Sequence, residues 1–327
     1  MKIGIILPYF GGFNSYFHIW MNTVRNNPEI DWLLFTDQII NTEIPSNCII
    51  YSITFSELKK LFESKFNTKI YLKTPYKLCD YKPYYGFLFS EYLKDYDFWG
   101  YCDCDLIFGN IRTFITDELL EKYDKLLRRG HFSLIRNSED INQNFMAFDT
   151  YKTVITSPVI YGYDESIKGY HLGFAGELME KGYRFYDEKR YIADIDFRHF
   201  PFFRIENTEQ PLAFKSHSGK LYELSVIGNR ISEEEIMYVH FQKRFFDEVT
   251  EDVDKDIYII PNRMIACDSI TMNPETLLKL ISTEKPGYYD VYREKMDSIK
   301  RDIKRFIYEP KKLNSILYRV FGHRKHR

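Results

Sequence analysis

The sequence predicts an α/β fold in which a mixed, largely parallel sheet is flanked by helices and followed by a helical C-terminal tail. Three observations lead to this prediction. Short apolar runs typical of buried strands alternate with amphipathic helical patterns between residues 2 and 108. Polar residues follow several of these runs, at the strand ends where such sheets bind ligands. The length of 327 residues, 44% of them hydrophobic, is enough for one large core.

The N-terminal half alternates strands and helices along the chain. The second helix should begin with a capping residue, Thr54 or Ser56, ahead of an amphipathic run. The expected elements, in order, are a strand (2–10), a helix ended by Asn26, Asn27 and Pro28, strands at 30–38 and 47–55, helices at 54–66 and 82–96, and a strand at 98–108.

The remainder of the chain shows a less regular pattern. Residues 170–187 predict a helix that ends at Gly182 and is followed by a strand, and residues 130–142, 199–207 and 237–245 are typical of strands and loops. We therefore expect one domain over residues 1–265 and a helical extension over residues 266–327.

Composition excludes several classes of protein. The five cysteines show no metal-binding spacing and no disulfide framework, and no apolar run approaches the ~18 residues of a membrane span. A cytoplasmic protein fits both observations best. Outside its tail the chain is acidic, which argues against nucleic-acid binding.

The tail carries the opposite charge. Residues 296–327 contain ten Lys/Arg and three Asp/Glu, and apolar residues from Leu313 to Phe321 recur at helical spacing. A basic amphipathic helix of this kind can hold a protein on an anionic membrane surface. The alternative is a terminal helix that packs on its own domain.

Two carboxylates, Asp103 and Asp105, lie within the otherwise apolar stretch DFWGYCDCDLIFGNI. An ionised carboxylate is costly to bury unless it pairs with a cation, binds a metal or takes up a proton. If the stretch is extended, both acids share one face and the thiols of Cys102 and Cys104 share the other. Oxygen ligands without thiols favour Mn²⁺ or Mg²⁺.

A histidine near the end of another apolar run is the best candidate for a third ligand. His240 lies in EEEIMYVHFQKRFF and is followed by Lys243 and Arg244, whose charges would balance a diphosphate. Taken singly, His240 could equally be a core histidine, and the two cations a solvated face.

Several segments together resemble a group of bacterial cell-surface polysaccharide proteins, largely held as a domain of unknown function and placed among GT-A glycosyltransferases. The resemblance covers roughly residues 1–250. The segments, in order, are PYKLCDYKPYYGFLFSEYLKDYDFWGYCDCDLIFGNI, YGYDES, KSHSGKLYEL and EIMYVHFQKRFF. This resemblance implies a GT-A-like fold in which Asp105 is a direct metal ligand, Asp103 a metal or ribose contact, and His240 the third metal ligand.

The same resemblance suggests where the nucleotide sugar would bind. Pro8 and Tyr9 follow the first strand, where the nucleotide is expected, and Asp37 ends the second, where a uridine contact is expected. Lys82 could reach the donor phosphate or sugar, and Asp80 could fix that lysine.

Sugar transfer with inversion needs a general base for the acceptor hydroxyl, and the sequence leaves inversion and retention open. Asp164 and Glu165 match an acidic pair of the resembling family, and one of them should be the base or an acceptor contact. Helix capping is the alternative role. Glu177 is expected on a helix surface.

The leading hypothesis is a metal-dependent glycosyltransferase that moves a sugar from a nucleotide-diphosphate sugar, UDP-linked, to a cell-surface polysaccharide or lipid-linked glycan. Two alternatives remain open: a metal-dependent nucleotidyltransferase or phosphohydrolase, and a catalytically silent sugar-binding protein on the same fold. No glycine-rich phosphate signature or second carboxylate cluster supports the phosphoryl enzymes.

Overall fold

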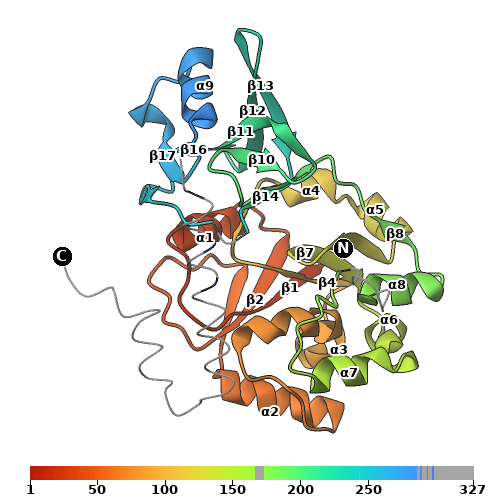
Figure 1. The fold of residues 1–327 in the computed structure, drawn as a ribbon. Coiled ribbons are helices and arrows are strands. Elements are labelled where there is room, and N and C mark those ends of the chain that lie inside the picture. The colour runs from red at the N-terminus through yellow and green to blue at the C-terminus, as the bar shows by residue number, and fades with distance from the viewer. Residues whose placement is uncertain (166–172, 243, 286–287, 289–292, 294–296, 298–327) are drawn as a thin grey trace.

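A computed structural model describes residues 1–165, 173–242, 244–285, 288, 293 and 297. Its centre is a seven-stranded mixed sheet (Figure 1) with the strand order β3-β2-β1-β4-β7-β6-β8. These strands are β1 (Ile3–Pro8), β2 (Ile30–Thr36), β3 (Cys48–Ser52), β4 (Phe98–Cys102), β6 (Lys125–Arg129), β7 (Phe132–Arg136) and β8 (Phe185–Tyr186).

The direction of the strands changes across the sheet. β1, β2, β3 and β4 run parallel, whereas β7 is antiparallel to both β4 and β6. The carboxyl ends of β1, β2 and β4 therefore meet at one edge of the sheet. The mixed α/β fold predicted from the sequence is confirmed. Sheets of this kind bind ligands at the edge where the carboxyl ends of parallel strands meet.

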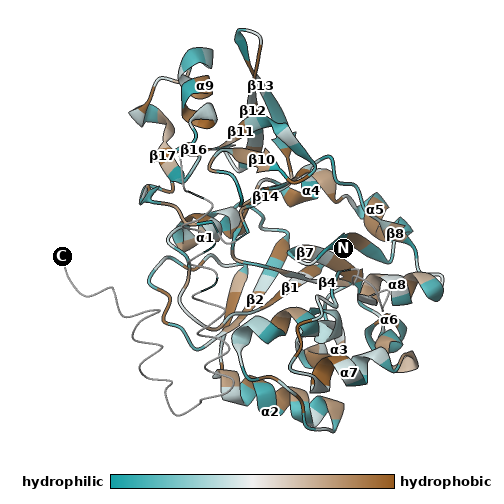
Figure 2. Cartoon of the chain, in the orientation of Figure 1, coloured by the Kyte–Doolittle hydropathy of each residue, from teal (hydrophilic) through white to brown (hydrophobic). Residues whose placement is uncertain are grey.

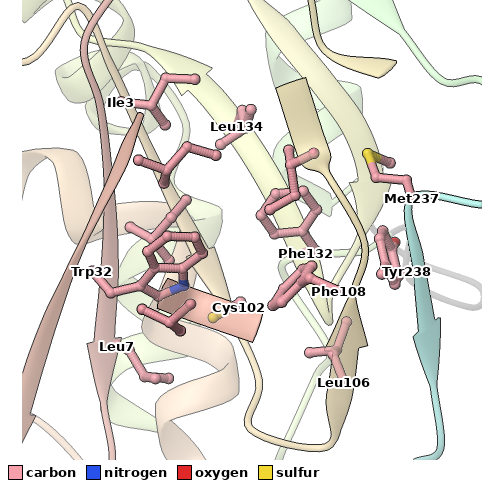
Figure 3. Packing of buried hydrophobic residues seen from close by; sticks show 14 of the residues in the cluster. Ile3, Leu7, Trp32, Cys102, Leu106, Phe108, Phe132, Leu134, Met237 and Tyr238 are labelled. Atoms are coloured by element: carbon pink, nitrogen blue, oxygen red, sulfur yellow. The ribbon is translucent and has the colours of Figure 1, made fainter. Parts of the chain in front are cut away.

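Apolar side chains cover both faces of this sheet. On one face, α1 (Phe17–Arg25) packs Trp20 and Val24 against residues such as Ile5 and Trp32. Figure 3 shows part of this core, in which Trp32 and Phe108 lie near Cys102 and Leu106. Burying side chains on both faces of a parallel sheet explains why its strands are continuous apolar runs rather than alternating ones.

The opposite face is covered by α2 (Phe55–Phe66) and a series of short helices. The Thr54 hydroxyl accepts a hydrogen bond from the backbone N–H of Glu57, and the Glu57 carboxylate accepts one from the backbone N–H of Thr54, so the predicted cap is confirmed at Thr54. Leu58 and Phe62 are the buried residues of α2, and its surface alternates between hydrophilic and hydrophobic (Figure 2).

The single helix expected over residues 82–96 is wrong. The chain forms the 3₁₀ helix η1 (Pro75–Tyr84), one turn of α-helix, α3 (Tyr85–Leu88), and the 3₁₀ turn η2 (Ser90–Tyr92). Pro83 has no N–H to continue an α-helical ladder. At Gly86 a Cβ would lie 2.5 Å from Trp99 Nε1, so packing on β4 also fixes the backbone here.

A small three-stranded sheet joins distant parts of the chain. It consists of β5 (Leu106–Phe108), β9 (Ile192–Asp194) and β14 (Tyr238–His240), with β14 in the middle, antiparallel to β5 and parallel to β9. Its register places His240 opposite both Leu106 and Asp194. This sheet therefore brings His240, the candidate third metal ligand, next to Leu106 and so close to the two acids of the DCD stretch.

Residues 202–266 form a second, mainly antiparallel sheet that the alternation of strands and helices did not predict. A long hairpin of two of its strands, β12 and β13, projects from the molecule (Figure 1). Its strands are β10 (Phe202–Arg204), β11 (Asn207–His217), β12 (Lys220–Ile227), β13 (Arg230–Ile236), β15 (Glu248–Val249), β16 (Ile257–Ile260) and β17 (Arg263–Ala266).

The last described helix, α9 (Pro274–Ser282), packs on this second sheet. Leu277 and Ile281 are fully buried in a cluster with Ala213 and Leu224. Within the described residues no helix is long and apolar enough to cross a membrane. The expected basic helix, residues 313–321, lies outside the described residues.

The remaining helices are short, and several of them pack with α2 on the same face of the first sheet. The helix predicted to end at Gly182 ends at Glu180, two residues earlier, and is followed by β8 as expected. These helices are α4 (Ile111–Phe114), α5 (Asp117–Lys122), α6 (Glu139–Gln143), η3 (Asn144–Ala147), α7 (Thr150–Thr156), α8 (Gly173–Glu180) and η4 (Cys267–Ser269).

Candidate active site

The two acids of the DCD motif lie in a bend between β4 and β5, not in a continuous strand as expected. The backbone N–H of Asp103 donates to the carbonyl of His131 (3.0 Å), and the carbonyl of Asp105 accepts from the N–H of Phe241 (2.9 Å). Cys102 and Cys104 are buried in the apolar core. The bend therefore produces the separation predicted for a strand, with thiols in the core and carboxylates outside it.

The candidate metal ligands converge. One donor atom each from Asp103, Asp105 and His240 can be chosen so that all lie within 4.8 Å of one another. Asp105 Oδ1 is buried and makes no hydrogen bond to any described residue, and it lies 3.5 Å from His240 Nε2. A buried carboxylate oxygen that faces an imidazole and makes no other hydrogen bond to a described residue fits a divalent cation, which accepts such oxygen ligands together with one imidazole.

A second acid orients the imidazole. His240 Nδ1 lies 2.8 Å from Asp194 Oδ1, and only 12% and 9% of the two side chains is exposed. Once His240 has lost a proton, an Nδ1–H that donates to Asp194 would leave the Nε2 lone pair directed toward Asp105, which is the tautomer that metal binding requires. Burial lowers the pKa of His240, but Asp105 and Asp194 outweigh it and raise that pKa to about 10.

A buried histidine supports His240 from its other face. The ring of His131 stacks on that of His240 with centroids 4.1 Å apart and planes 21° apart. Burial, and then the nearby cationic His240, hold the pKa of His131 well below its ordinary value. His131, Asp194 and His240 also bring donor atoms within 4.8 Å. However, the nitrogen lone pairs of two stacked imidazoles run parallel and do not converge on a single ion. Asp103, Asp105 and His240 therefore make the better metal site.

Lys82 joins the carboxylates to the neighbouring turn. Its Nζ lies 2.8 Å from Asp103 Oδ1, 2.7 Å from the carbonyl oxygen of Gly130 and 3.8 Å from Asp164 Oδ2. Asp103 and Asp164 raise the pKa of Lys82 well above its ordinary value despite burial, which favours the neutral amine. The lysine occupies Oδ1 of Asp103 and leaves Oδ2 for a cation or a ribose hydroxyl.

Asp80 does not fix Lys82, contrary to expectation. It forms a fully buried ion pair with Lys77 (2.7 Å), and its carboxylate also accepts from the backbone N–H groups of Tyr161 and Tyr163. Asp80 therefore holds the chain segment that leads into Asp164.

Asp164 and Glu165 lie against the turn between β6 and β7. The N–H of Gly130 donates to Glu165 Oε1 (2.8 Å), and a Cβ at Gly130 would lie 2.6 Å from Asp164 Oδ2. Asp164 is 4% exposed, whereas Glu165 is exposed. Burial raises the pKa of Asp164 to about 7, although Lys82 opposes the shift. Asp164 therefore exchanges a proton near neutral pH, as a general base must.

Three residues expected at the nucleotide lie at the predicted edge of the sheet. Pro8 ends β1 and Tyr9 follows it, and burial, with the charges of Cys104, Asp105 and Asp103, raises the pKa of Tyr9. Asp37 is exposed after the end of β2 and accepts from Gln38. Tyr9 thus lies beside the acids, while Asp37 is on the second strand away from β4.

Of the two basic residues expected beside His240, Arg244 points elsewhere. Gln242 adopts a left-handed conformation (φ 55°), and the chain turns. Arg244 is buried and donates to the backbone carbonyls of His199 and Phe200, with its guanidinium over the ring of Phe202. Lys243 lies outside the described residues.

Two residues of this site were missed, and one was misplaced. Asp194 and His131 were not predicted, although an acid in the short apolar run YIADIDF was a usable signal for Asp194. Glu177 is buried rather than on the helix surface, and it accepts from the Tyr163 hydroxyl. Burial raises its pKa to about 6.

Comparisons with known proteins give a family and remote structural similarities. No curated protein matches the chain significantly. The galactosyltransferase LgtC, solved with donor and acceptor sugar analogues, is similar at 12% identity and a TM-score of 0.35 over 59% of this chain and 76% of that one. The apo-form glycosyltransferase GlyE of Streptococcus pneumoniae TIGR4 is similar at 14% identity and a TM-score of 0.30, over 59% of this chain and 46% of that one. Residues 5–268 match the model of a family of unknown function, DUF6625, and the protein belongs to this family.

Proposed function

We propose that the protein is a metal-dependent glycosyltransferase. Its donor would be a nucleotide-diphosphate sugar, UDP-linked, and its acceptor a growing cell-surface polysaccharide or lipid-linked glycan. The observation that carries the proposal is the convergence of Asp103, Asp105 and His240 at the carboxyl end of β4, with a buried oxygen of Asp105 beside the imidazole of His240.

The residues around the cluster support transfer chemistry. Mn²⁺ or Mg²⁺ held there would neutralise the donor diphosphate and the charge that develops on the leaving nucleoside diphosphate. Asp105 and His240 would hold the cation directly, and Asp103 would hold it or contact the ribose. Lys82 stays charged beside Asp103, so it both fixes that carboxylate and adds positive charge where the phosphates would lie.

An acid is available for the acceptor proton. Asp164 or Glu165 would accept the proton of the attacking hydroxyl, or hold the acceptor sugar. Asp164 has the pKa that suits a base at neutral pH, and Glu165 has the exposure. Asp164→Asn and Glu165→Gln, assayed side by side for turnover and acceptor KM, would assign the two roles.

A thermal-shift experiment tests the proposal. Wild-type protein is heated with UDP, other nucleotides and UDP-sugars, each with and without Mn²⁺. We expect stabilisation by UDP plus Mn²⁺ that disappears in Asp105→Ala and persists in Asp149→Ala, which changes an exposed aspartate paired with Lys152. Equal stabilisation of wild type and Asp105→Ala by every nucleotide would contradict the proposal.

Product analysis separates this activity from the phosphoryl enzymes. A glycosyltransferase releases UDP only as the sugar appears on an acceptor, whereas a phosphohydrolase releases phosphate without one.

Removal of residues 296–327 tests the proposed membrane contact. We expect the truncated protein to leave the membrane fraction while it keeps activity on a short soluble acceptor. Unchanged fractionation would argue against the contact.

A further inference from the structure

A polar cavity of about 310 Å³ lies on the second sheet, away from the metal ligands. This volume is at the small end of the ~300–1,000 Å³ that ligand pockets occupy. Leu212 is its one apolar lining residue among the described residues, and the rest of the lining is polar: Arg190, Arg204, Asn207, Gln210, Glu223 and Glu234.

Strand register explains why these side chains gather. Glu223 of β12 lies directly opposite Glu234 of β13 and opposite Phe214 of β11. Since alternate residues of a strand share a face, Gln210 and Leu212 project on the same side as Phe214. Most of the lining therefore belongs to the sheet face itself, and Arg190 joins it from the turn that precedes β9.

The charges in the cavity are already balanced. Arg204 Nε lies 2.9 Å from Glu223 Oε2, with 19% and 14% of the side chains exposed, and Arg190 Nε lies 3.2 Å from Glu234 Oε1 at the rim. Arg204 also donates to the backbone carbonyls of Arg190 and Ile192. With two cations paired to two anions, no net charge remains to hold a phosphate or another anionic ligand.

What remains is a set of fixed, planar hydrogen-bonding groups. Guanidinium, carboxylate and amide groups each present adjacent donors or acceptors, and this spacing matches neighbouring hydroxyl groups of a sugar ring. A peptide segment would need more apolar lining than Leu212 supplies. The lining thus favours an uncharged ligand rich in hydroxyl groups.

A chain of contacts leads from this cavity to the metal ligands. Glu206, next to the lining residue Asn207, binds Arg129 Nη2 (2.8 Å), and Arg129 Nη1 lies 3.8 Å from Asp194 Oδ2. Asp194 is the carboxylate that orients His240. The cavity is therefore linked to the proposed donor site through three successive side-chain contacts.

We propose that this cavity binds a neutral saccharide, as a subsite for the acceptor glycan. The acceptor role rests on the proposed glycosyltransferase function, whereas the binding of the saccharide does not. Glu234 and Arg190 at the rim would contact hydroxyl groups, and Arg204 with Glu223 would form the floor.

The test is saturation-transfer NMR on the full chain. The panel contains neutral di- and trisaccharides of hexoses and N-acetylhexosamines, with sialyllactose as an anionic probe. Glu234→Ala removes an exposed lining residue. Glu235→Ala is its matched control, because Glu235 is the next residue of the same strand, faces the other side and pairs with Lys220.

We expect a neutral saccharide to bind wild type and Glu235→Ala equally, and Glu234→Ala at least about tenfold more weakly, the usual effect of losing a hydrogen bond to a charged group. Arg190→Ala should repeat the loss. The proposal is overturned if no neutral saccharide binds, if only sialyllactose binds, or if Glu234→Ala binds like wild type. Stabilisation by UDP plus Mn²⁺, measured on the same samples, reports on the proposed function separately, because these variants leave the metal ligands intact.

Discussion

Removing one partner of the buried ion pair between Lys77 and Asp80 should destabilise the fold strongly, and Lys77→Met tests this. The side chains are 2% and 0% exposed, and their charged atoms are 2.7 Å apart. The substitution keeps the length and apolar volume of the side chain but leaves the Asp80 carboxylate buried without its cation. Removing one partner of a buried pair costs about 3–5 kcal/mol. The backbone N–H groups of Tyr161 and Tyr163, which still donate to Asp80, place the expected loss at the lower end, about 3 kcal/mol.

The assay is urea unfolding followed by fluorescence, with Lys152→Met as the control. Lys152 and Asp149 have the same three-residue spacing and a similar distance of 2.8 Å, but their side chains are 64% and 93% exposed. Exposed pairs contribute at most about 1 kcal/mol. The double variant Lys77→Met/Asp80→Asn should recover part of the loss, because it no longer buries an unpaired charge.

A loss in Lys77→Met no larger than in Lys152→Met would refute this reasoning. It would mean that water or a rearranged side chain reaches Asp80 and compensates its charge. If the reasoning holds, Lys77→Met should also lower any transfer activity without removing metal binding, because Asp80 holds the segment that precedes Asp164.

Three further predictions concern the site. The pKa of His240 is raised to about 10, so the imidazole carries an extra proton at neutral pH and Mn²⁺ must displace that proton to bind. Calorimetry between pH 6 and 8.5 should therefore show a Mn²⁺ affinity that rises roughly tenfold per pH unit. An affinity that does not change with pH would contradict this. Gly130→Ala places a Cβ 2.6 Å from Asp164 Oδ2 and should lower turnover at least about tenfold while UDP–Mn²⁺ binding, measured by thermal shift, stays unchanged. The pKa of Glu177 is raised from 4.5 to about 6, so its ionisation destabilises the fold as pH rises from about 4.5 to about 6, and the effect levels off above that. Relative to wild type, Glu177→Gln should gain about 1 kcal/mol of stability in urea unfolding between pH 5 and pH 8, and a constant difference would argue against it.

The parts of the fold that the sequence predicted well are those determined by local pattern. β1 and β2 are short apolar runs bounded by polar residues, and the cap of α2 is a Thr–Glu pair at the required spacing. The acids at 103 and 105 were also placed together correctly, although by a bend. A strand and this bend both satisfy the same requirement, which is that the thiols are buried in the core and the carboxylates stay outside it.

The parts that were wrong or missed depend on distant residues. No local pattern shows that Gly86 fits against Trp99, or that the three successive glutamates Glu233–Glu235 belong to a strand whose partner is β12. Arg244 follows His240 closely in sequence, yet the left-handed Gln242 turns the chain, and the guanidinium points to the second sheet. The separation of two residues in the sequence predicts that their side chains are close in space only when the backbone conformation between them is known.

The position of β14 in the middle of its small sheet has a consequence for biosynthesis. Asp105 leaves the ribosome long before His240, and the two are joined only when β14 inserts between β5 and β9. A slip of one residue during this insertion would turn the imidazole to the opposite face. The nascent chain can therefore form much of its first sheet early, but the proposed metal site is complete only after correct strand insertion, so a slip at this late step would yield folded molecules that lack the site.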